Sequence, residues 1–195
     1  MIVLKLGGSL AEAGTIQSWL GALAGAGGRH CALVAGGGLF ADAVREAQKV
    51  HGFSDRAAHR MALLAMEQYA LMLADLEPTL VPCAEIDEMK TVIGRGGIPV
   101  WLPYDMALAT PSIAASWDVT SDSLAAWLAR RLGARKLVLV KSLAAPAGPL
   151  SPLDLARRGL VDAAFPEFVS GADFDIVWLG PGEQRRLDTA LCGAS

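Results

Sequence analysis

The chain opens on Met1-Ile-Val-Leu-Lys-Leu-Gly-Gly-Ser-Leu10, a short apolar run that one lysine interrupts and two glycines end. Such a run predicts a buried strand, and the glycines predict a turn into a helix after Ser9. A lysine near the end of a buried strand must have its charge accommodated, so we expect Lys5 to face an anion. Glycine backbone lets N–H groups approach that anion, and the positive end of the next helix would attract it. The decapeptide alone is compatible with two interpretations, a phosphate site or a plain turn beside a solvated lysine.

The order strand, glycine turn, helix occurs a second time, at Cys31–Ala35, Gly36-Gly37-Gly38 and Leu39–Val50. Two such units predict an α/β fold whose ligands bind at the carboxyl ends of largely parallel strands. Further strands are expected at Leu80–Pro82, Ile98–Leu102, Lys136–Val140 and Phe174–Leu179, and further helices at Ile16–Ala26, Ser54–Leu76, Ser123–Leu132 and Pro152–Arg158. At 195 residues and with no linker that divides it, the chain is expected to form one domain over residues 1–195. We predict a three-layer α/β/α sandwich with a mostly parallel central sheet.

Composition argues against several classes of protein. The chain is 53% hydrophobic and 19% charged, with a net charge of -3 and no block of lysine or arginine, so we expect no nucleic-acid partner. Its first apolar run is too short for a signal peptide, and no stretch reads as a membrane span. Three scattered cysteines, Cys31, Cys83 and Cys192, lack metal-site spacing and predict reduced, buried thiols. We therefore expect a cytoplasmic protein.

The predicted helix from Ser54 to Leu76 is apolar around much of its circumference. Ser54 is expected to cap its N-terminus, with Asp55 favourable in the first turn. We interpret its methionines as core packing rather than as contacts to a cofactor. Because so apolar a helix must be covered, we expect it to be deeply buried or to pack against a second copy of the chain, which predicts a homo-oligomer.

The three consecutive glycines at 36–38 are expected to form a wall against which a small substrate or an anion lies. With the following residues they fit a relaxed dinucleotide-binding pattern, but no second strand ends in an acidic residue at the required distance, which disfavours NAD. The chain has no Walker A motif either, so a phosphate would be held differently from a P-loop. Phosphoryl transfer depends on positioning and on cations around the moving group. A carboxylate that holds Lys5 would complete such a site, and Asp118 and Asp122 are the candidates, with helix N-capping as the alternative for both.

Three motifs occur in the order found in the amino acid kinase superfamily: Lys5-Leu-Gly-Gly-Ser9, Gly36-Gly-Gly38 and Thr120-Ser-Asp122-Ser-Leu-Ala-Ala-Trp-Leu-Ala129. Over most of its length the chain resembles this superfamily, which includes acetylglutamate, carbamate, uridylate and isopentenyl phosphate kinases and the aspartokinases. The resemblance implies an ATP-dependent kinase that uses Mg²⁺. It also implies that Lys5 contacts the transferring phosphoryl group, that the glycine turns bind phosphate or substrate through their backbone, and that Asp122 orients the lysines.

On this resemblance we assign site residues, none of them as a metal ligand. The expected catalytic residues are Lys5, Asp122 and Lys141. The expected ATP- and phosphate-binding residues are Lys5, Gly7, Gly8, Ser9, Lys141 and Ser142. The expected substrate-binding residues are Gly36, Gly37, Gly38, Arg45 and His59, with Arg56 and Arg60 as further candidate cations.

The chain departs from the superfamily pattern in the region that follows Val140. Most relatives carry Thr-Asp there, whereas this chain has Lys141-Ser142, and the usual Gly-Gly-Met…Lys element with the second catalytic lysine is not found. Two interpretations of Lys141 stay open: it replaces that second lysine, or it only binds ATP phosphates.

Within the superfamily, the chain is similar to the small aspartokinase-like branch. The shared features are its shortness, the Ala58–Tyr69 helix and the ending Asp175-Ile-Val-Trp-Leu-Gly180. That branch includes an ATP-dependent enzyme of methanofuran-type cofactor biosynthesis that converts a phosphomonoester into a diphosphate, and the resemblance implies this reaction. The alternatives are a kinase of a carboxylate, a carbamate or a nucleoside monophosphate, and a nucleotide-binding or storage protein without turnover.

Overall fold

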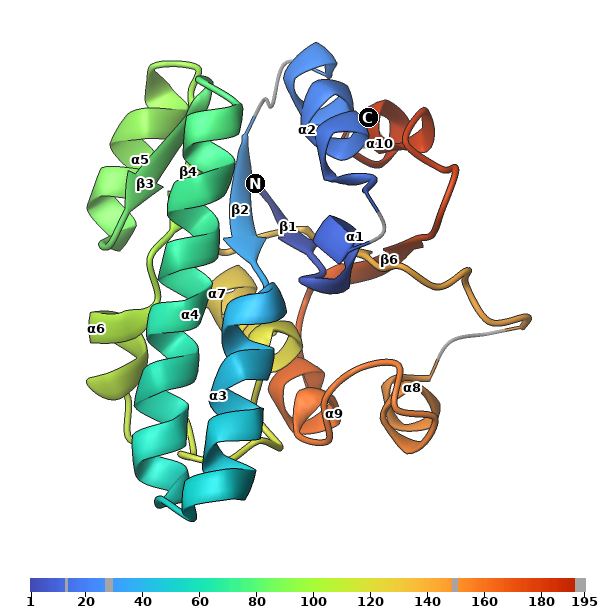
Figure 1. Ribbon diagram of the computed structural model, residues 1–195. Coiled ribbons are helices and arrows are strands. Elements are labelled where there is room, and N and C mark those ends of the chain that lie inside the picture. The colour runs from blue at the N-terminus through green and yellow to red at the C-terminus, as the bar shows by residue number, and fades with distance from the viewer. Residues whose placement is uncertain (13, 27–29, 149–150, 192–195) are drawn as a thin grey trace.

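The computed structural model describes residues 1–12, 14–26, 30–148 and 151–191 (Figure 1). Within these ranges, six parallel strands form one sheet in the order β3-β4-β2-β1-β5-β6. The strands are β1 Ile2–Leu6, β2 Cys31–Ala35, β3 Leu80–Cys83, β4 Ile98–Trp101, β5 Lys136–Val140 and β6 Asp175–Leu179. The N-terminal strand β1 therefore lies in the middle of the sheet, between β2 and β5.

The helices of the described residues alternate with these strands, as expected for parallel crossovers. They are α1 Ser9–Glu12, α2 Ile16–Gly25, α3 Gly38–His51, α4 Asp55–Leu76, α5 Ile86–Gly94, α6 Tyr104–Leu108, α7 Ser121–Arg131, α8 Pro152–Arg157, α9 Phe165–Val169 and α10 Arg186–Leu191. Residues 27–29, which follow the helix expected at Ile16–Ala26, and the thiol of Cys192 lie outside the described residues. Cys31 and Cys83 are buried free thiols.

Two hydrophobic cores, one on each face of the sheet, give the three layers. Alternate side chains of β1 enter different cores, because successive strand residues point to opposite faces. Val3 joins the core that includes α7 and α9, whereas Leu4 joins the core that includes α2 and α10. The predicted three-layer sandwich is confirmed, with a sheet that is entirely parallel in the described residues.

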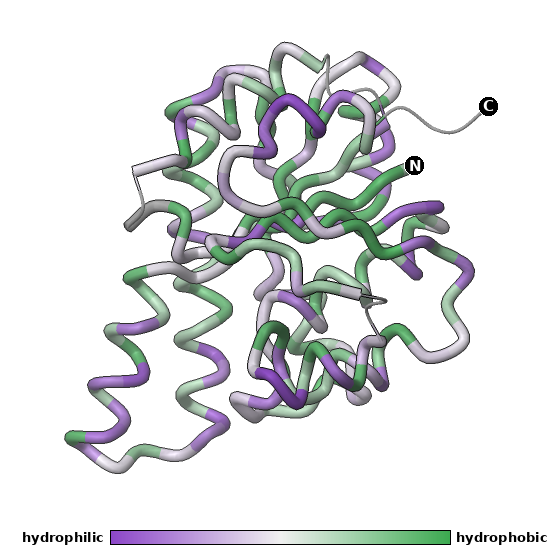
Figure 2. Tube along the Cα trace, turned by 90° about the vertical axis from the view of Figure 1, so that its right-hand side faces the viewer, coloured by the Kyte–Doolittle hydropathy of each residue, from purple (hydrophilic) through white to green (hydrophobic). Residues whose placement is uncertain are grey.

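Helices α3 and α4 pack side by side and project beyond the edge of the sheet where the strands end (Figures 1 and 2). Ser54 caps α4 as predicted, accepting a hydrogen bond from the Ala57 amide. The helix is only partly buried: Tyr69 and Leu73 are enclosed, whereas Met61, Leu64, Leu71 and Leu76 are 40–53% exposed. The exposed apolar face leaves packing against a second copy as a prediction.

Other differences from the sequence-based expectations are local. Helix α7 begins at Ser121 rather than Ser123, and the short helices α6 and α10 were not expected. The earlier start of α7 has a clear cause, because Asp162 accepts the hydrogen bonds that its first turn offers. In the described part of the chain, no helix has the length and apolarity needed to cross a membrane.

Candidate functional site

The pleat of the sheet places two lysines on the same face. Lys5 has the opposite orientation to Leu4 and therefore points toward α7. In the parallel ladder Lys5 lies beside Leu139 of β5, and Lys141 follows Leu139 by one full pleat. Both lysines thus emerge at the carboxyl ends of adjacent strands, under the first turn of α7, which carries Asp122.

Asp122 lies between the two lysines and binds both. Its Oδ1 atom is 2.8 Å from Lys5 Nζ, and its Oδ2 atom accepts a hydrogen bond of 2.6 Å from Lys141 Nζ. The side chains of Lys5, Asp122 and Lys141 are only 5%, 6% and 13% exposed. Two ammonium groups and one carboxylate leave one positive charge in a nearly closed place. Since burying a charge is costly unless it is paired, the site is suited to an anion such as a phosphate.

The three charges also shift one another's protonation. Burial acts to raise the pKa of Asp122, but the ammonium groups of Lys5 and Lys141 outweigh it and hold the pKa below its usual range. Burial, followed by repulsion from Lys5, lowers the pKa of Lys141 to about 8, against the opposing effect of Asp122. Asp122 is therefore a carboxylate at neutral pH, and Lys141 is a cation whose charge can be lost in mildly alkaline solution.

Glycines bring the turns that follow β1 and β2 into contact. A Cβ atom at Gly8 would overlap the backbone of Gly38, and one at Gly36 would overlap the backbone of Gly8. Gly38 also has a φ of +51°, which other residues rarely adopt. On the other side, Ser9 Oγ lies 2.9 Å from Ser142 Oγ in the loop after β5. Three loops at the strand ends thus meet around the lysines.

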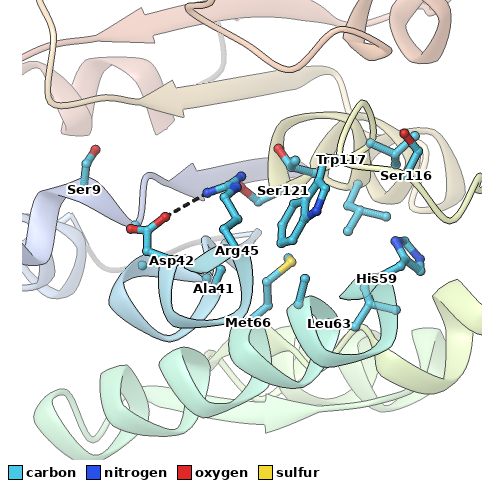
Figure 3. Close-up of a pocket in the computed structure, with 17 residues that line it drawn as sticks. Ser9, Ala41, Asp42, Arg45, His59, Leu63, Met66, Ser116, Trp117 and Ser121 are labelled. Carbon is cyan, nitrogen blue, oxygen red and sulfur yellow. Dashed lines mark hydrogen bonds and ion pairs between the residues drawn. The ribbon is translucent and has the colours of Figure 1, made fainter. Parts of the chain in front are cut away.

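A pocket of about 220 Å³ extends from the glycine turns along α3 and α4 (Figure 3). Gly8 and Ser9 line one end, and His59 lies toward the other, with Met66 and Trp117 between them. The remaining lining residues are Gly37, Gly38, Ala41, Asp42, Arg45, Ala62, Leu63, Ser116, Val119, Thr120, Ser121 and Leu124. A pocket that combines an apolar lining with a few polar groups is typical of a small-molecule site.

Trp117 lines the side of the pocket, and its indole ring contacts two side chains of α3. The guanidinium of Arg45 lies 4.4 Å from the centre of the indole ring, and the Trp117 Nε1–H donates a 2.6 Å hydrogen bond to Gln48. Arg45 also pairs with Asp42 at 2.8 Å (Figure 3). Burial lowers the pKa of His59, so its imidazole is neutral at neutral pH.

The structure brings most of the predicted site residues together. Lys5, Gly7, Gly8, Ser9, Asp122, Lys141 and Ser142 gather at the strand ends, and Gly37, Gly38, Arg45 and His59 line the pocket. Gly36 is buried against Gly8, and its lack of a side chain allows the two turns to come into contact. Arg56 and Arg60 are not among the lining residues, and Arg60 donates to the Tyr104 hydroxyl.

Asp118 caps no helix: its carboxylate accepts a hydrogen bond from Ser116. Asp122 lies inside the first turn of α7 and does not cap it either. Sequence reasoning missed Trp117 and Met66 as lining residues and Asp162 as a partner of α7. Met66 belongs to a stripe that was assigned to the core, and Trp117 and Asp162 lie in irregular segments without a periodic signal.

The residues of the site are compatible with a Mg²⁺ ion that binds mainly through the phosphates of a nucleotide. No group of three or more His, Cys, Asp or Glu side chains among the described residues could hold a metal ion. Both oxygens of Asp122 are already engaged by lysines. Mg²⁺ commonly binds substrate phosphates and keeps several waters, and there it would neutralise phosphate charge.

Comparisons with known proteins agree with this fold. A sequence model described as the amino acid kinase family matches residues 1–144, so the chain belongs to that family. The family expectation is thereby confirmed.

A curated protein of Methanocaldococcus jannaschii, named (5-(aminomethyl)furan-3-yl)methyl phosphate kinase, is 27% identical over 140 residues. The match covers 71% of this chain but only 64% of that protein. Among solved structures, a uridylate kinase from Archaeoglobus fulgidus is 18% identical with a TM-score of 0.74, over 100% of this chain and 96% of that one. A UMP kinase from Bacillus anthracis is 14% identical with a TM-score of 0.72, over 97% and 91%. At these identities the structural matches show a shared fold.

Proposed function

We propose that the protein is an ATP-dependent phosphotransferase that phosphorylates a small phosphomonoester to give a diphosphate. The observation that carries the proposal is the pair of buried lysines that one carboxylate holds beside a glycine-walled pocket. Family membership and the name of the Methanocaldococcus jannaschii relative support it. A role in methanofuran-type cofactor biosynthesis, cytoplasmic location and self-association through the exposed face of α4 are parts of the same proposal.

In the proposed reaction, an oxygen of the acceptor phosphate attacks the γ-phosphorus of ATP. The bond from that phosphorus to the bridging oxygen breaks, and ADP leaves with its electron pair. Lys5 and Lys141 offset the charge on the transferring group, while Asp122 keeps both ammonium groups aimed at it. Amide groups of the turns at Gly8 and Gly38 hold phosphate oxygens. Such preorganised charges are the main protein contribution to phosphoryl transfer.

The pocket favours an acceptor that is already ionised. Its lining includes one carboxylate, that of Asp42. This carboxylate forms an ion pair with Arg45, so it is poorly placed to act as a general base. His59 lies toward the end of the pocket opposite Ser9 (Figure 3). An alcohol would need a nearby general base, whereas a phosphate or carboxylate oxygen needs cations alone. This argument supports an oxyanion acceptor, and the name of the relative supports a phosphomonoester within that class.

Acceptor specificity is tested by ADP release from Mg-ATP with four candidate acceptors. These are the aminomethylfuran phosphate named for the relative, acetylglutamate, carbamate and UMP. We expect turnover with the phosphomonoester of the small ring and a new diphosphate signal in ³¹P NMR. Turnover with acetylglutamate, carbamate or UMP alone would replace the proposed acceptor. Nucleotide binding without ADP release on any acceptor would favour a storage or binding protein.

The charge of Lys141 should set an alkaline limit to activity. Its pKa of about 8 means that the ammonium form dominates below that pH and is lost above it. We therefore expect kcat/KM for ATP, which reports groups of the free enzyme, to fall as the pH rises through about 8. In Lys141→Arg the cation cannot be deprotonated. The decrease of kcat/KM at high pH, the alkaline limb of the profile, should therefore disappear in this variant. A limb that persists unchanged in Lys141→Arg would show that another group titrates.

A further inference from the structure

Asp162 anchors the start of helix α7 from outside that helix. It lies in the segment between α8 and α9. Its Oδ2 atom accepts hydrogen bonds from the Thr120 amide at 3.0 Å, the Thr120 hydroxyl at 2.8 Å and the Ser123 amide at 3.0 Å. Its Oδ1 atom accepts a further hydrogen bond from the Ser123 hydroxyl, and Ser123 is completely buried. One carboxylate thus takes four donors from two residues.

This anchoring replaces an ordinary cap. Thr120 is the N-cap residue of α7 but makes no side-chain capping bond to its own helix. A negative group at a helix N-terminus satisfies free amides and is favoured by the helix dipole. Asp122 lies between the two anchored residues, Thr120 and Ser123. Fixing both neighbours leaves little freedom for the backbone that carries Asp122.

We propose that Asp162 is a positioning residue that fixes Asp122 between Lys5 and Lys141. The inference rests on the proposed phosphoryl-transfer function, and it concerns a residue beyond the 1–144 region that the family model matches. Asp122 contacts Lys5 at 2.8 Å and Lys141 at 2.6 Å. Because both contacts are short, a small displacement of Asp122 would weaken them. Asp162 itself touches neither lysine in the described contacts, so it acts through the first turn of α7.

The test uses Asp162→Asn, which keeps the size of the side chain but has one acceptor oxygen. Loosening Asp122 removes the influence that raises the pKa of Lys141, while burial and Lys5 continue to lower it. The charges that face Lys141 are Lys5 on β1 and Asp122 on α7, and the Trp178 ring lies 5.8 Å away on β6. We expect the Lys141 pKa, measured by NMR titration of its side chain, to fall below that of the wild-type protein. We also expect the alkaline limb of kcat/KM to move to lower pH, and kcat to decrease about 10- to 100-fold.

A second variant separates positioning from the loss of charge. Ser123→Ala keeps the Asp162 carboxylate and removes one of its four donors, so it should shift the Lys141 pKa in the same direction by a smaller amount. Glu88→Gln is the matched control, because Glu88 caps α5 through the amides of Ala84 and Glu85 and has no contact with Lys5 or Lys141 among the described residues. It should leave the titration and kcat unchanged.

The outcomes distinguish this inference from the proposed function. A Lys141 pKa that stays at the wild-type value in both Asp162→Asn and Ser123→Ala overturns the positioning role, even if the wild-type enzyme turns over. A shift in Asp162→Asn with none in Ser123→Ala overturns it as well, since a direct charge effect would then suffice. If the pKa moves as expected but the wild-type protein shows no turnover on any acceptor, the anchoring stands and the catalytic function fails.

Discussion

Asp122→Ala is expected to remove almost all turnover and to weaken the fold. Without the carboxylate, the buried ammonium group of Lys5 has lost its counter-charge, and Lys141 beside it is favoured to lose its proton. Removing one partner from a buried ion pair typically costs about 3–5 kcal/mol, and we expect a loss of that size in urea unfolding at pH 7. Lys141 then also loses the group that raises its pKa, so it becomes largely neutral and kcat falls by on the order of 10³-fold.

The stability effect of Asp122 has a defined pH dependence. Because its pKa is lowered in the folded state, its contribution is complete above its ordinary pKa of 3.8 and is lost as the pH falls through the lowered value. Asp122→Ala should lack this dependence on the acid side. Asp87→Ala is the control, since Asp87 is 93% exposed and pairs with Lys90 on the surface of α5. A variant of Asp122 with wild-type unfolding and wild-type kcat would contradict the assignment.

Lys5→Ala should also strongly reduce activity, but it should spare the fold. Its removal leaves Asp122 and Lys141 as a one-to-one pair, so no charge is left without a partner. We expect kcat to fall roughly 10²-fold or more, which is typical for the loss of a group that stabilises transition-state charge. Steady-state kinetics and thermal unfolding of the same sample separate the two effects.

The same variant changes the titration of its neighbour in a known direction. Repulsion from Lys5 contributes to the lowered pKa of Lys141, so the alkaline limb should move to higher pH in whatever activity remains. Lys90→Ala, on the surface of α5, should change neither kcat nor the limb. An unchanged kcat in Lys5→Ala would refute the central role given to this residue.

The sequence is sufficient for the parts of the site that depend on local order. Lys5 and the glycine turns are adjacent in the chain, and a strand, a turn and a helix follow directly from their pattern. The residues alone left Asp118 and Asp122 as candidates, and the resemblance to the amino acid kinase superfamily selected Asp122. The sheet edge at which these groups meet follows from the parallel fold.

Other parts depend on packing that a single sequence does not contain. Whether Lys141 approaches Lys5 depends on β5 pairing with β1, and the order of strands in a sheet is not a local property. Asp162 and Trp117 find their partners across irregular segments, where no periodicity marks a side chain as facing a helix. The short helices α6 and α10 were missed for the same reason, since they are too brief to show a helical stripe.

The central position of β1 has a consequence for how the protein is made. β1 precedes the other five described strands in the chain, but one of its two neighbours, β5, comes only at residues 136–140. Until then, one edge of β1 and the charge of Lys5 have no native partner, because Asp122 also arrives late in the chain. Pairings between distant segments form slowly, so closure of β1 against β5 is expected to be the step at which a nascent chain acquires both its sheet and its lysine pair.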